Sequence, residues 1–296
     1  MERGSPFGTA TIAGQVYRSE GLSTLLRRGV EYAINRSRIH PGVHWRVARA
    51  YYLRRCANDV AEYEAAPDPF RLAWIDPDRI VRHTRREYPP YRDRMALFGA
   101  VRGGNWDRRD RPPIDPAYRG PPARLFVADR FEESVLYRSL EAHFDRGVPW
   151  AETELVREAL ALLGDPTVER VWHECTTAAE IRQRCRRLDR LYESIREEGY
   201  RSRREQFGVD PAVGFRDSLR EEMAVDVGRD GELLLVCGKH RLAIAKLLDL
   251  DRVPVVFLVR HPEWMRRREA VARGEVRASH PDLRDLRAES GSRSVR

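Results

Sequence analysis

The sequence contains almost no lysine, few cysteines and no long apolar run. Only two of its 54 lysine and arginine residues are lysines, Lys239 and Lys246, and they lie in one short segment. The four cysteines form no Cys-x-x-Cys pair, so we expect reduced thiols rather than a zinc site or a disulfide framework. No apolar run approaches the roughly 18 residues of a membrane span, and the start lacks a hydrophobic signal core. We therefore expect a cytoplasmic protein without a transmembrane segment.

The composition is that of a globular, arginine-rich chain. Its 296 residues are 42% hydrophobic and 34% charged, enough for one large or two modest domains with a heavily solvated surface. The net charge of +8 is compatible with phosphate-bearing partners, including non-specific nucleic acid bound through the basic surface. His173-Glu174-Cys175 has no second cluster at metal-ligand spacing, so no metal site is predicted.

The segment 233–259 predicts a strand, a tight basic turn, a helix and a second strand. An apolar run precedes Gly238, which gives the backbone freedom for a reversal, and apolar residues at helical spacing follow it. The free N–H groups and positive dipole end of that helix would lie beside basic side chains, an arrangement that binds anions. The predicted phosphate site consists of Gly238, Lys239, His240 and Arg241.

Within this turn we expect Arg241 to contribute most to binding, because a guanidinium can grip two phosphate oxygens at once. The alternative is that Arg241 pairs with a structural carboxylate such as Glu222 or Asp226. Lys246 is expected to be a solvated helix position. We further expect the turn to form the floor of a concave site between the first strand and the helix 181–198.

Three segments of the chain resemble the ParB/sulfiredoxin superfamily. Gly238-Lys-His-Arg, the Leu-Ala-Ile-Ala-Lys-Leu-Leu that follows and a Val-Pro-Val-Val strand are similar to its Gly-x-x-Arg turn, helix and short strand. Residues 70–80 are similar to its opening strand and Asp-Pro-x-x-Ile turn, and residues 191–200 to its helix ending in Ser-Ile-x-x-x-Gly. The resemblance implies an α/β (α+β) fold built on a small mixed sheet.

The resemblance also implies a ligand and further site residues. In ParB-type proteins the loop after the first strand carries basic residues that join a nucleotide site, which here indicates Arg85 and Arg86. Related small-molecule kinases use a glutamate of this region as general base, and Glu87 is the nearest match; the alternative is a surface ion pair. The implied ligand is a nucleoside triphosphate or diphosphate with Mg²⁺. Trp106, after a Gly-Gly turn, is a candidate for stacking on a base or for the core.

Differences between this sequence and the superfamily pattern reduce the number of candidate functions. Sulfiredoxins place their reactive cysteine directly before the His-Arg pair, where this chain has Lys239, so sulfinic-acid repair is not expected. No helix-turn-helix pattern follows residue 259, and no tight acidic cluster of the two-metal kind is present, so operator binding and nuclease activity are not favoured either. Two hypotheses remain: phosphoryl transfer from a nucleotide to a small molecule, or a non-catalytic nucleotide-responsive or nucleic-acid-associated binding protein.

The distribution of apolar and charged residues, together with the resemblance, divides the chain into four parts. Residues 1–68 form an amphipathic helical region, 69–105 and 179–262 the superfamily-like module, 106–178 a helical insertion, and 263–296 a charged tail expected to be solvated and mobile. Peripheral membrane contact by the N-terminal helices is the less favoured reading, because most amphipathic helices cover a core. Capping boxes are predicted at Asp129-x-x-Glu132 and Thr177-x-x-Glu180, and Cys185 is expected in the core.

Overall fold

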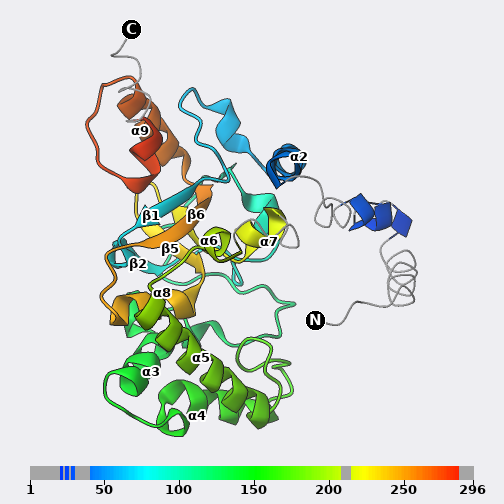
Figure 1. Ribbon diagram of the computed structural model, residues 1–296, viewed down its shortest axis with the longest axis vertical. Helices are drawn as coiled ribbons and strands as arrows, with labels where there is room; N and C mark the ends of the chain where they lie inside the picture. The colour runs from blue at the N-terminus through cyan, green and yellow to red at the C-terminus, as the bar shows by residue number, and fades with distance from the viewer. Residues whose placement is uncertain (1–20, 23, 27, 31–40, 208–214, 287–296) are drawn as a thin grey trace.

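The computed structural model describes residues 21–22, 24–26, 28–30, 41–207 and 215–286. They form a mixed α/β fold around a six-stranded sheet of order β1-β6-β4-β5-β2, with β3 paired to β6 (Figure 1). The expected α/β class with a mixed sheet is therefore confirmed. Most of the N-terminal helical stretch expected from the sequence lies outside the described residues.

The strands are short, and their pairing is mixed. Their bounds are β1 Leu72–Ile75, β2 Ile80–His83, β3 Ala100–Val101, β4 Met223–Val227, β5 Leu233–Cys237 and β6 Val253–Arg260. Strand β6 runs parallel to β3 and β4 but antiparallel to β1, and β5 is antiparallel to β4 and parallel to β2. Every residue of β6 is buried, which explains its continuous apolar sequence at the centre of the sheet.

Alternate residues of the central strands enter two different cores. In β5, Leu233 and Leu235 pack into one core, whereas Leu234 and Val236 pack into the other. This follows from the two-residue period of a strand. The larger core holds the helices α3, α4, α5 and α8, and the smaller one holds α2 and α7. The sheet is thus covered by helices on both faces.

The helical layer below the sheet in Figure 1 combines the helices of the insertion with α5 and α8. Its helices are α3 Val135–Phe144, α4 Glu154–Ala161, α5 Ala178–Glu198 and α8 Lys239–Leu247. The remaining helices are α2 Pro41–Leu53, α6 Arg203–Phe207, α7 Phe215–Arg220 and α9 Pro262–Ala272. Because α3 and α5 both contact α8, the insertion lies against the basic turn.

The helix starts test the capping predictions. Thr177 and Glu180 form the expected capping box at the start of α5, and Cys185 on that helix is buried. At the insertion the structure differs from the sequence prediction, because α3 begins later. Ser134 caps it by accepting from the Tyr137 N–H at 3.2 Å.

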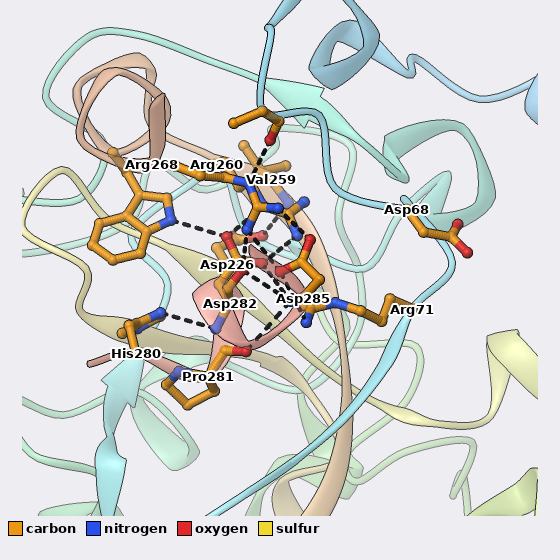
Figure 2. Close-up of polar contacts among 12 residues, drawn as sticks. Asp68, Arg71, Asp226, Val259, Arg260, Arg268, His280, Pro281, Asp282 and Asp285 are labelled. Carbon is orange, nitrogen blue, oxygen red and sulfur yellow. Dashed lines mark hydrogen bonds and ion pairs between the residues drawn. The ribbon is translucent and has the colours of Figure 1, made fainter. Parts of the chain in front are cut away.

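The C-terminal part of the chain is anchored by a buried carboxylate (Figure 2). Asp282 is fully buried and accepts hydrogen bonds from Arg260 at 2.6 and 3.0 Å, from Trp264 Nε1 at 3.0 Å and from Arg71 at 3.2 Å. Arg268 donates to its backbone carbonyl. The sequence predicted a solvated tail from residue 263 onward; residues 263–286 instead contain α9 and this network, because paired charges can be buried.

None of the helices in the described ranges is long and apolar enough to cross a membrane.

Candidate anion-binding site

The basic turn predicted from the sequence begins α8. Gly238 has φ +97°, a conformation that disfavours side chains, and a Cβ added there would lie 2.9 Å from Met223 Cγ. The first intrahelical bond joins the Leu242 N–H to the Gly238 carbonyl at 2.9 Å. The preceding amides have no acceptor within the helix and form its positive end.

Lys239, the first residue of α8, lies against the insertion rather than in open solvent. Its Nζ is 3.2 Å from the centroid of the Phe126 ring, and Phe126 itself is buried. Burial and then the charge of Arg184 lower the pKa of Lys239 to about 7, and no carboxylate of the described chain offsets them. The amine therefore rests on an aromatic face as a cation without a counter-ion.

His240 is buried and lies between two donors. Trp172 Nε1 is 3.2 Å from His240 Nε2, and Arg184 Nη2 is 3.3 Å from His240 Nδ1. An indole N–H can only donate, so Nε2 is the acceptor and the hydrogen of the neutral ring is on Nδ1. This Nδ1–H faces a guanidinium that also only donates. The two groups cannot bond each other, and one shared acceptor atom would satisfy both.

The charges around His240 have one sign. Burial, followed by Arg184, Lys239 and His173, lowers the pKa of His240 well below its ordinary value. The pKa of His173 is lowered to about 4 by burial, Arg184 and Lys239. The one nearby acid that opposes the shift of His173 is Glu174, which is exposed and pairs with Arg170 at 2.8 Å. We call Lys239, Arg184, His240 and His173 the cationic cluster.

A second buried imidazole borders the cationic cluster from the sheet side. His83 ends β2 and is 5% exposed, yet neither of its ring nitrogens has a hydrogen-bond partner within the described part of the chain. Burial, Lys239 and Arg85 lower its pKa to about 3, so the ring is neutral with one free donor and one free acceptor. Buried polar atoms are normally bonded, so the ring nitrogens of His83 and the Nε of Arg184 are groups near Lys239 that a ligand could bond.

The structure turns Arg241 away from the cationic cluster. Its Nη2 donates to the Glu221 carbonyl just before β4. Asp226, one of the two carboxylates considered as its alternative partner, instead pairs with Arg86 at 2.7 Å. The contribution of Arg241 to ligand binding stays a prediction. In this structure its guanidinium donates a hydrogen bond to a backbone carbonyl instead.

The other predicted site residues lie in different surroundings. Arg85 is buried, donates to the Ala128 carbonyl at 2.7 Å and approaches the cluster through His83. Arg86 is held by Asp226, and Glu87 is exposed. Trp106 is buried in the smaller core and donates to the Arg102 carbonyl at 2.7 Å. Of the predicted residues, the cluster therefore contains Lys239 and His240, with Arg85 bordering it.

The location of the site differs in part from the expected one. Helix α5 contributes Arg184 to the cluster, but the adjoining strand is β2 through His83, not the first strand β1. Sequence reasoning missed Arg184, His173, Trp172 and Phe126. Arg184 falls one residue before Cys185 on a helix rich in arginine, so nothing in the sequence separates it from its solvated neighbours.

One cavity of about 240 Å³ lies on the opposite side of the sheet, between α2, α7 and β1. It is lined by Trp45, Arg46, Arg49, Asp68, Phe70, Leu72, Phe215, Ser218, Leu219 and Glu222. Arg49 in this cavity already pairs with Asp68 at 3.0 Å. Acidic side chains therefore line this cavity together with the basic ones, unlike the cationic cluster.

The described residues contain no group of three or more histidine, cysteine or acidic side chains placed to hold a metal ion. No family model matches the chain, and no curated protein or solved structure matches it either. The resemblance to the ParB/sulfiredoxin superfamily thus depends on the quoted residues alone and stays a prediction.

Proposed function

We propose that the cationic cluster binds the phosphate group of a small molecule, with nucleotides as the first class to test. The observation that carries this proposal is the pair of donors, Arg184 Nη2 and the Nδ1–H of His240, which lie 3.3 Å apart with no acceptor from the described chain. A phosphate oxygen beside the pair, at hydrogen-bond distance from each nitrogen, would accept from both. Lys239 would add a third donor and a second cation, and the start of α8 would favour a bound negative charge as well.

The donor set supports binding of a metal-free phosphate. Mg²⁺ prefers oxygen ligands, whereas the groups gathered in the cluster are guanidinium, ammonium and imidazole nitrogens. Glu174, the acid that acts on His173, is exposed and paired with Arg170. Phosphoryl transfer would also require a base beside the acceptor, and Glu87, the residue proposed for that role, is exposed. The proposal is therefore a nucleotide- or phosphate-binding protein without transfer chemistry.

Calorimetric titration tests this proposal. Inorganic phosphate, ADP and ATP are titrated separately, each with Mg²⁺ and with a chelator, and adenosine measures any contribution of the base. We expect phosphate-bearing ligands to bind in the chelator as well. Arg184→Ala should weaken binding at least about tenfold, since a hydrogen bond to a charged group contributes about 1.5 kcal/mol or more.

The matched control is Arg182→Ala, which removes the same charge from an exposed position of α5. It should leave the affinity within about twofold, because its guanidinium is solvated and screened. Equal affinities of folded Arg184→Ala and wild-type protein would refute the site. Tighter binding of single-stranded oligonucleotides than of mononucleotides would instead support the nucleic-acid alternative.

A further inference from the structure

The two lysines of this chain lie in opposite surroundings. Lys246 Nζ contacts Glu132 Oε1 at 2.6 Å and Asp78 Oδ1 at 3.1 Å, which is the setting of a stable ammonium. Lys239 Nζ instead lies on the Phe126 ring, and the neighbouring group that most affects its charge is the cation Arg184. The Lys239 residue as a whole is half-buried.

An amine becomes a nucleophile when its protonated form is disfavoured. Apolar surroundings and a neighbouring cation are the two established ways to do this for lysine, and Lys239 has both. Its lowered pKa, about 7, is consistent with this geometry. The titratable and charged groups that act on it or are affected by it are Arg184 on α5, Cys237 on β5, His240 on α8, His173 before α5 and His83 at the end of β2.

We propose that Lys239 forms a Schiff base with the carbonyl carbon of a phosphorylated aldehyde or ketone whose phosphate is held by Arg184 and His240. The inference extends the proposed function by assigning a substrate class and a nucleophile. The Nζ lone pair attacks the carbonyl carbon and a C–N bond forms. Nitrogen loses its two hydrogens, and the carbonyl oxygen leaves with them as water. No oxidation or reduction occurs, so no further reactant is needed.

Because the chain has only two lysines, chemical labelling of amines can test this proposal with few competing sites. Pyridoxal 5′-phosphate serves as the probe because it carries both an aldehyde and a phosphate, and borohydride reduction fixes any imine as a stable secondary amine. The only other primary amines of the chain are Lys246 and the N-terminus. Proteolysis and mass spectrometry of the wild-type protein therefore assign each adduct to one of three positions.

We expect one dominant adduct at Lys239, formed at least about tenfold faster than with pyridoxal, which lacks the phosphate. Excess inorganic phosphate should suppress it. Lys246→Arg should retain the adduct, and Lys239→Arg should lose it. If Lys239→Arg does not fold, the map of the wild-type protein still decides.

Two results would overturn the inference: labelling of Lys239 no faster than that of Lys246 or the N-terminus, or labelling of Lys239 that phosphate does not suppress. The proposed function fails separately. If phosphate binds in calorimetry and Arg184→Ala weakens it, but Lys239 is not labelled, only the Schiff base is refuted. If phosphate does not bind at all, the proposed function and this inference are both refuted.

Discussion

Asp282 is the residue whose replacement should most reduce the stability of the fold without touching the proposed site. Its carboxylate is fully buried and holds Arg260, also fully buried, through two hydrogen bonds of 2.6 and 3.0 Å. Asp282→Asn keeps the shape but removes the charge and leaves Arg260 as an unpaired buried cation. Breaking one partner of such a pair costs about 3–5 kcal/mol. We expect a loss of that size in the free energy of unfolding.

Urea unfolding followed by circular dichroism measures the loss. The matched control is Asp230→Asn, because Asp230 pairs with Arg108 at 3.0 Å while both side chains are exposed. A surface pair of this kind contributes less than about 1 kcal/mol. A shift of the midpoint in Asp282→Asn no larger than that in Asp230→Asn, at unchanged slope, would refute the reasoning.

The pH dependence gives a second check on the same residue. Burial alone would raise the pKa of Asp282, but the charge and hydrogen bonds of Arg260, then Arg268 and Arg71, lower it below its ordinary value. A lowered pKa means that the contribution is complete above the unfolded-state value, about 3.9, and is lost only as the pH falls below it. The stability difference between wild type and Asp282→Asn should therefore be constant from pH 7 to about pH 5 and shrink below about pH 4.

The sequence predicted the elements that depend on local pattern. Residues 233–236, an apolar run before glycine, form β5, and Thr177 with Glu180 caps α5 as its spacing indicated. These signals are short-range, since strand period, cap chemistry and left-handed glycine are each set within a few residues. Local patterns did not predict the structure of residues 263–286. Their composition does not show that Asp282 is buried against Arg260 and Arg268.

Only the site residues that lie together in one short segment could be predicted from the sequence. Lys239 and His240 were found from the turn itself, whereas Arg184 and Trp172 reach His240 from 56 and 68 residues away in the chain. The direction of Arg241 was not predictable either, because adjacent positions of a helix point about 100° apart and the turn does not fix which of them faces α5. Tertiary packing of the insertion therefore decided which cations meet.

Two further predictions test the turn and its charge. In thermal unfolding, Gly238→Ala should destabilise the protein by at least about 1 kcal/mol more than Gly274→Ala. Both glycines have positive φ, but of the two only Gly238 has a neighbour that the added Cβ would meet, Met223 at 2.9 Å. Equal losses of stability would mean that the positive φ alone decides the effect. Sulfate, whose charge is constant near neutrality, should bind more weakly as the pH rises through about 7, since Lys239 loses its proton there while the lowered pKa of His240 keeps that ring neutral throughout. Calorimetry from pH 6 to pH 8 should show this decline in sulfate affinity in the wild-type protein and not in Lys239→Met. A decline that persists in the variant would assign the titration to another group and remove Lys239 from the anion site.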